Sequence, residues 1–311
     1  MSFLSGMRER RAARYYQEAA RLARLGSPGK ALEALNQVIE LAPGHAEAYY
    51  QRGVQLARLG RHEQALADFD QVCTLMPGQT DADYRRAIEL SGLGRHKEAL
   101  SAADEFLRRF PGNTDALLVR GAELSELGQP EDALEAFDEV LSGDPGHAVA
   151  HHNRAVLLTK LGRRDEALDA YDRSIASAPE QIYFRVGKGK ALTAAGELDR
   201  ARNEFEASSR LRAEEAGEAE AWAAAILWHQ GEPQAARERF TQAKRHLTGG
   251  PSAKNTMLEA IALCALGDPS AAEQALREGS GTPSGEDFDR LCELLSDPPL
   301  PGIDRLRSAR T

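Results

Sequence analysis

The phrase LGRHEQAL occupies Leu59–Leu66 and returns with small changes further along the chain. It recurs as LGRHKEAL at Leu93–Leu100 and as LGRRDEAL at Leu161–Leu168. The later phrases begin 34 residues and then a further 68 residues on, and 68 is twice 34. One period of 34 residues accounts for both intervals, so the chain is predicted to consist of repeated structural units.

Four kinds of residue recur in phase when the chain is laid out in steps of 34. Glycines fall at Gly26, Gly60, Gly94, Gly128, Gly162 and Gly196, and prolines at Pro43, Pro77, Pro111, Pro145 and Pro179. Alanines fall at Ala31, Ala65, Ala99, Ala133, Ala167 and Ala201. Four residues after each alanine stand Leu35, Phe69, Ala103, Phe137, Tyr171 and Phe205.

Each class has a physical role in a helical hairpin. Glycine takes the left-handed conformation that ends a first helix. Alanine allows two helices to approach closely, and the residue one turn later fills the gap between them. Proline ends the second helix, because it lacks an amide donor and restricts the residue before it. Each repeat is therefore predicted to be helix, turn, helix, turn.

This pattern resembles the tetratricopeptide repeat family. The small residue that the family has at its eighth position is Ala19, Gly53, Ala87, Gly121, Ala155 and Gly189. An aromatic residue near the fourth position is kept as Tyr15 and Tyr49 but lost at Asp83, Leu117 and Arg185. The resemblance implies an all-α, right-handed α-solenoid (superhelix) of about eight helix-turn-helix units with a C-terminal capping helix. Six well-formed repeats span residues 12–215, after an N-terminal lead-in at 1–11.

The repeat phase slips after residue 215. The next turn glycine is Gly231 rather than residue 230, so the region RAEEAGEAE contains one inserted residue. Two divergent repeats are predicted at 216–280, followed by a glycine-rich linker and a capping helix at 281–297. The tail at 298–311 is predicted to be irregular, with the alternative that Ile303 and Leu306 anchor it over the last helix.

Composition and charge exclude several classes of protein. With 28% charged and 42% hydrophobic residues, the chain has the composition of a folded water-soluble protein. Its net charge of -9 disfavours nucleic acid as a partner. No long apolar run predicts a membrane span. Three cysteines without a CxxC pair indicate free thiols, and a short apolar stretch before the first arginines is unlike a signal peptide, so a cytoplasmic location is expected.

No motif of the sequence predicts catalysis. His147, His151 and His152 are close in sequence, but His45 and His147 share the phrase PGHA at the same repeat phase, which favours a local role at a helix start. The phrase GKGKAL at Gly187–Leu192 lacks the strand and spacing of a phosphate loop. The chain is therefore not expected to be an enzyme or to hold a metal or other cofactor.

The resemblance instead implies a binding surface, because first helices of this family line a concave groove. Residues expected to face it are Tyr16, Tyr50 and Tyr84 at the fifth position, Val54 and Ile88 at the ninth, and His152, Asn153 and Lys190 in a more polar second half. A ladder of tyrosines over small residues suits an extended peptide. The alternative is that these tyrosines only pack between neighbouring repeats.

Each of two rows of charged residues has a purely structural interpretation as well as a functional one. Glu47, Asp81 and Asp115 form an acidic row, but acids in a first turn are also favoured by the helix dipole. A basic row could bind anions, but long basic side chains can also cover the seam between repeats, which is the favoured interpretation. The basic row consists of Arg52, Arg86, Arg120, Arg154 and Lys188.

The predicted function is a non-catalytic scaffold or adaptor whose partner is another protein or an extended peptide. One alternative is a ligand-responsive regulator. Another is self-association, with Trp222 and Trp228 as an exposed joint, although burial of both in a repeat core is the favoured interpretation. A receptor for chaperone C-terminal tails is disfavoured, because Tyr50 and Val54 replace the Lys and Asn expected of such repeats.

Overall fold

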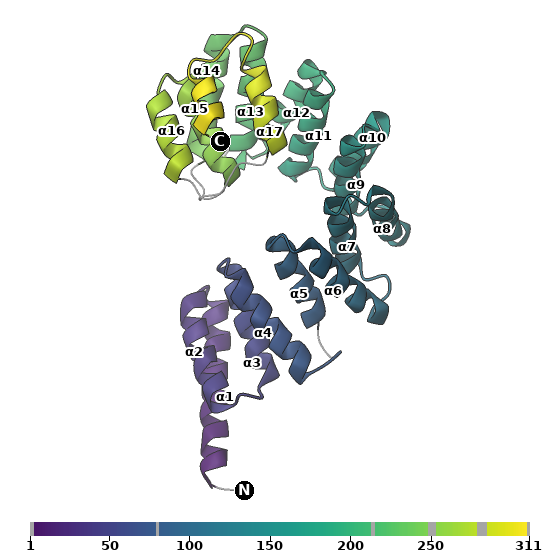
Figure 1. The fold of residues 1–311 in the computed structure, drawn as a ribbon, viewed down its shortest axis with the longest axis vertical. Coiled ribbons are helices and arrows are strands. Elements are labelled where there is room, and N and C mark those ends of the chain that lie inside the picture. Colours follow the sequence, from purple (N-terminus) through teal and green to yellow (C-terminus); the bar gives the residue numbers. More distant parts are fainter. Residues whose placement is uncertain (1–2, 79–80, 213–214, 248–252, 279–284, 310–311) are drawn as a thin grey trace. The chain divides into compact units, whose positions relative to one another are not determined.

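The structure is a computed structural model that describes residues 3–78, 81–212, 215–247, 253–278 and 285–309. Every named element in these ranges is an α-helix. The chain divides into two compact units, the N-terminal unit Met1–Pro145 and the C-terminal unit Gly146–Thr311. Each unit is a stack of helical hairpins (Figure 1).

The N-terminal unit contains four hairpins, in which each odd-numbered helix pairs with the helix that follows it. They are α1 (Phe3–Arg24) with α2 (Pro28–Leu41), α3 (Ala46–Arg58) with α4 (His62–Leu75), α5 (Ala82–Gly92) with α6 (His96–Arg109), and α7 (Thr114–Glu126) with α8 (Pro130–Gly143). Helix α1 already begins at Phe3, so most of the predicted lead-in belongs to the first helix.

The C-terminal unit also contains four hairpins, followed by two more helices. The hairpins are α9 (Ala148–Lys160) with α10 (Arg164–Ser177), α11 (Ile182–Ala194) with α12 (Leu198–Leu211), α13 (Gly217–His229) with α14 (Pro233–His246), and α15 (Ala253–Ala265) with α16 (Pro269–Glu278). The last helices are α17 (Gly285–Leu294) and α18 (Ile303–Ala309). The prediction of an all-α solenoid of about eight hairpins is confirmed.

The phased residues have the roles that their spacing predicted. Gly60 ends the first helix of its hairpin with a φ of 69°, in the left-handed region that favours glycine. Gly121 lies against Phe137 of its partner helix, and a Cβ at residue 121 would come within 2.5 Å of the Phe137 ring. Phe137 is fully buried, so the small residue and the large one are a matched pair. Close approach of the two helices therefore depends on both.

Histidines at two repeat boundaries act as helix caps. The Nδ1 atom of His45 accepts a hydrogen bond from the backbone N–H of Ala48, and that of His147 accepts one from Ala150. Each bond gives a side-chain acceptor to a backbone donor of the first helical turn, where intrahelical acceptors are lacking. The local role predicted from the repeated phrase PGHA is confirmed.

The C-terminal segment folds back over earlier helices of its unit. Helix α17, predicted as a cap, packs mainly on α13, while α18 packs on α15 and α16. The tail predicted to be irregular therefore contains a helix. Its Ile303 and Leu306 are buried, as the alternative interpretation expected, but they belong to a helix that packs mainly on α15 and α16 and not on the capping helix α17. The linker residues 281–284 and the last residues 310–311 lie outside the described residues.

Candidate functional site

The three predicted groove tyrosines lie half-buried on α1, α3 and α5. The Tyr16 hydroxyl donates to Glu47 at 3.3 Å, and the Tyr50 hydroxyl donates to Asp81 at 3.0 Å. Both acceptors belong to the following repeat. Burial, followed by the charge of Glu47, raises the pKa of Tyr16 to about 12. The sequence treated the tyrosines and the acidic residues as two separate rows, but the first two members of each row form pairs between neighbouring repeats.

The surroundings of these tyrosines offer little enclosed space. Val54 and Ile88 lie half-buried on the same helices. A cavity beside Tyr16 has a volume of only about 20 Å³, enough for about one water molecule. A ligand at this row would therefore contact an open surface.

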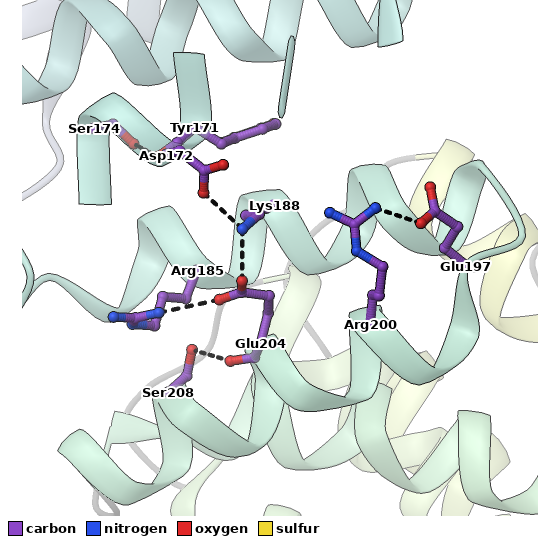
Figure 2. Close-up of polar contacts among 9 residues, drawn as sticks. All are labelled: Tyr171, Asp172, Ser174, Arg185, Lys188, Glu197, Arg200, Glu204 and Ser208. Carbon is purple, nitrogen blue, oxygen red and sulfur yellow. Dashed lines mark hydrogen bonds and ion pairs between the residues drawn. The ribbon is translucent and has the colours of Figure 1, made fainter. Parts of the chain in front are cut away.

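The basic row pairs with carboxylates of the second helices. Arg52 binds Asp68 through two nitrogens, at 2.8 and 2.6 Å. Lys188 donates to Asp172 of the preceding hairpin and to Glu204 of its own hairpin, both at 2.7 Å (Figure 2). The charged ends of these side chains bind acids at the seam between repeats instead of reaching water alone. Arg52 and Lys188 therefore link the two helices of a hairpin, and Lys188 also links neighbouring hairpins.

The first-helix face, meaning the surface made by the first helix of each hairpin, contains a pocket in the C-terminal unit. Its volume is about 430 Å³, within the usual range for ligand sites. His152 and Val156 of α9 line it together with Tyr183, Val186 and Lys190 of α11. Two predicted site residues, His152 and Lys190, are thus brought together. The third residue predicted for this half, Asn153, is half-buried on α9 and is not among the lining residues.

Lys190 is the centre of a charged cluster at one end of the pocket. Its Nζ atom lies 2.6 Å from Oε1 of Glu218 on α13 and 2.6 Å from Oδ2 of Asp287 on α17. It also lies 5.7 Å from the ring centre of Trp222. Burial alone would lower the pKa of Lys190, but the two carboxylates raise it above its ordinary value. Lys190 is therefore a cation that joins three helices.

His152 forms the aromatic side of the pocket. Its ring centre lies 5.6 Å from that of Tyr171 and 5.3 Å from that of Tyr183. Burial, with a smaller contribution from Lys190, lowers its pKa to about 4, so the imidazole is neutral at pH 7. Its Nδ1 atom is buried and has no hydrogen-bond partner among the described residues. A Cβ at Gly187 would lie 2.8 Å from this ring, so glycine there makes room for it.

Sequence reasoning missed the part of the pocket that comes from outside the predicted groove positions. Glu218, Asp287 and Arg290 all line it. Asp287 and Arg290 belong to the helix that was predicted only as a cap, so their position depends on how the C-terminal segment folds back. The apolar spacing of EDFDRLCELL indicated a packed helix, but nothing in it identified the surface that the helix covers.

Other side chains considered for function lie in the interior. Trp222 is 1% exposed and Trp228 is 6% exposed, which confirms the favoured interpretation of burial and removes the exposed joint. Within the described ranges, no group of three or more His, Cys, Asp and Glu side chains is placed to hold a metal ion. No helix there is both long enough and apolar enough to cross a membrane.

Hairpin stacks with an open first-helix face define the class of repeat scaffolds, and comparison with known proteins specifies the family. Tetratricopeptide repeat models match residues 16–80, 84–124, 124–185 and 186–252. The chain therefore belongs to the tetratricopeptide repeat family, and its fold is that of a protein-interaction scaffold. A comparison with curated proteins finds no match.

Solved structures share the fold at low sequence identity. A tetratricopeptide repeat protein from Parabacteroides merdae is 19% identical with a TM-score of 0.69, over 82% of this chain and 99% of that one. MamA from Desulfovibrio magneticus is 25% identical with a TM-score of 0.52, over 55% of this chain and 97% of that one. A thermophilic repeat protein from Thermus thermophilus is 23% identical with a TM-score of 0.52, over 58% of this chain and 99% of that one.

Proposed function

We propose that this chain is a non-catalytic adaptor that binds an extended peptide segment of another protein on its first-helix face. The observation that carries the proposal is the pocket of about 430 Å³ beside His152 and Lys190. It combines apolar walls at Val156 and Val186 with a few charged groups, which is the usual composition of a ligand site. Tyr183, which lines the pocket, remains 43% exposed, so this edge of the pocket is in contact with solvent.

In the N-terminal unit the proposed contacts are Tyr16, Tyr50 and Tyr84, with Val54 and Ile88 between them. The hydrogen bonds of Tyr16 and Tyr50 to the next repeat hold their rings in fixed orientations. A ring held in place loses little entropy when a ligand packs on it. These residues would offer the partner protein a separate contact surface, while the pocket of the C-terminal unit would supply specificity.

The proposal is tested by affinity capture from a lysate of cells that express the protein, followed by mass spectrometry. Ala194 is exposed at the mouth of the pocket, so Ala194→Trp fills the pocket without removing any packing. Ala176 is an exposed alanine of α10 outside the pocket, and Ala176→Trp is the matched control. A partner retained by the wild type and by Ala176→Trp, but lost from Ala194→Trp, is the expected result.

The tyrosine row needs its own comparison. The Tyr16→Ala, Tyr50→Ala and Tyr84→Ala triple variant is expected to retain less of the same partner than the wild type. Circular dichroism of the variant must match the wild type before a loss is assigned to the surface. Equal retention by the wild type, the triple variant and Ala194→Trp would reject the first-helix face as the binding surface.

A further inference from the structure

Helix α17 forms one wall of the pocket although it belongs to none of the hairpins. Asp287 and Arg290 both line the pocket, and residues three apart lie on the same face of a helix. Lys190 Nζ donates to Asp287 Oδ2 at 2.6 Å across 97 residues of sequence. This contact holds α17 against α11 and so fixes the position from which Arg290 lines the pocket.

The charged side chains around the pocket differ in whether they have a partner of opposite charge. Lys190 has carboxylate partners on both α13 and α17. Arg290, half-buried on α17, has no ion pair or hydrogen bond within the part of the chain that the structure describes. Three cationic side chains, including Lys160, line the pocket against two carboxylates. A guanidinium without a carboxylate at the wall of such a pocket can bind an acidic group through two parallel hydrogen bonds.

The surface next to these charges is apolar and aromatic. Val156 and Val186 lie on the two facing first helices, and Tyr183 presents an exposed ring beside them. The pocket therefore places a cation next to an apolar patch. A ligand that used both would have to carry an acidic group and a large apolar group close together.

The first-helix face already holds one segment with this chemistry. In α17, the Asp287 carboxylate binds Lys190. The next residue, Phe288, is 2% exposed and belongs to the same apolar cluster as Trp222. An acidic residue followed at once by a large buried apolar residue thus already occurs where the chain's own C-terminal segment binds Lys190 at the wall of the pocket.

We propose that the pocket binds a peptide segment in which an aspartate or glutamate adjoins a leucine, methionine or aromatic residue. The acidic side chain binds Arg290, and the apolar side chain packs between Val156, Val186 and Tyr183. This inference rests on the proposed function and goes one step further, because the proposed function requires only that some peptide binds.

The test is selection of phage-displayed random peptides on the full chain, with the displayed peptides fused at their C-termini so that only internal acids are offered. Wild type, Arg290→Glu and Arg173→Glu are compared. Arg173 is an exposed arginine of α10 outside the pocket, so its reversal is a matched change of charge. Peptides enriched on the wild type are then synthesised, and their affinities are measured by fluorescence polarisation.

The expected pool is enriched in acidic residues next to large apolar ones. Arg290→Glu then weakens the selected peptides about tenfold or more, the loss expected for one charge-assisted hydrogen bond, while Arg173→Glu does not. A pool without acidic residues that is lost on Ala194→Trp would overturn this inference and leave the proposed function standing. Acid-containing peptides that bind Arg290→Glu as tightly as wild type would also overturn it. Failure to enrich any peptide would count against both.

Discussion

Two pairs of first helices in the C-terminal unit use the same repeat positions in opposite ways. At the fifth, ninth and twelfth positions, α9 and α11 mix polar and apolar residues: His152, Val156, Thr159, Val186, Lys190 and Thr193. The last repeats contain extra residues. When these are allowed for, the corresponding positions of α13 and α15 are all apolar. They are Ala221, Ala225, Trp228, Met257, Ile261 and Cys264.

The difference is explained by what covers each face. Eleven of the 13 residues of α13 are buried, against five of 13 in α9. Helix α17 packs on α13, and the Trp228 Nε1–H donates to the carbonyl of Pro298 at 2.7 Å. A helix that is apolar all round is stable only when it is buried all round. The C-terminal segment supplies the missing cover, and it ends the open part of the face at α11.

This comparison indicates where an interaction surface remains in a repeat array. Open first helices keep polar residues among apolar ones, because the face is in contact with water. Covered first helices can lose the polar residues at these three positions, because the segment that covers them is part of the same chain. The pocket beside Lys190 lies at the border between the two kinds, where an open face meets the covering segment.

The difference between the covered and the open face is tested most directly by introducing a charge on each of them. Ala225→Asp, on the covered face of α13, is expected to lower the free energy of unfolding of the C-terminal unit by more than about 4 kcal/mol, because a buried carboxylate would have no partner. Ala194→Asp, on the open face, is expected to change it by less than about 0.5 kcal/mol. Both tryptophans lie in α13, so their emission during a urea titration reports this unit. Equal losses for the two variants would contradict the distinction.

A second pair of variants tests the covering segment itself. Leu291 of α17 is fully buried, and Leu291→Ala is expected to destabilise by about 2–5 kcal/mol. Val156→Ala, on the open wall of the pocket, is expected to lower the free energy of unfolding by less than about 1 kcal/mol. Tryptophan emission again follows the transition. If Leu291→Ala were as mild as Val156→Ala, α17 would be a loosely attached element rather than a cover.

The sequence predicted the parts of this structure that depend on local, repeated signals. The turn glycines, the close contact of Gly121 with Phe137, and the capping of helices by His45 and His147 all follow from residues a few positions apart or from one repeat period. Such signals recur at a fixed phase, so their physical cause can be read from the pattern.

The wall of the pocket could not be predicted in this way. The contact of Lys190 with Asp287 spans 97 residues, and that of Trp228 with Pro298 spans 70. No repeat phase relates these positions, because the C-terminal segment is not a repeat. One signal was present in the stretch AWAAAILW within α13, whose uniform apolarity requires cover on every side. It predicts that a cover exists but not which segment provides it.

On the open face, His152 makes the stability of the C-terminal unit depend on pH. The pKa of His152 is lowered to about 4 in the folded chain from an ordinary value of 6.5, so the unfolded chain binds the additional proton between these values. Stability from this group is therefore complete above about pH 6.5 and is lost as the pH falls toward 4. We expect wild type to lose about 1–2 kcal/mol more than His152→Phe between about pH 7 and pH 5. Urea titrations of both proteins at each pH measure this difference, and parallel curves would contradict it.

The smallest expected effect concerns the tyrosine row of the N-terminal unit, which is open like α9. Tyr50→Phe removes one hydrogen bond to Asp81 and is expected to cost about 0.5–1.5 kcal/mol. Tyr84→Phe is the matched control, because the Tyr84 hydroxyl has no hydrogen bond among the residues described. Hydrogen exchange of amides in α3 and α5 is expected to rise in Tyr50→Phe and to stay unchanged in Tyr84→Phe. If Tyr50→Phe leaves exchange unchanged but lowers the affinity for a partner, the hydroxyl contributes more to ligand binding than to the stability of the hairpin stack. The tyrosine row would then be a binding surface in its own right.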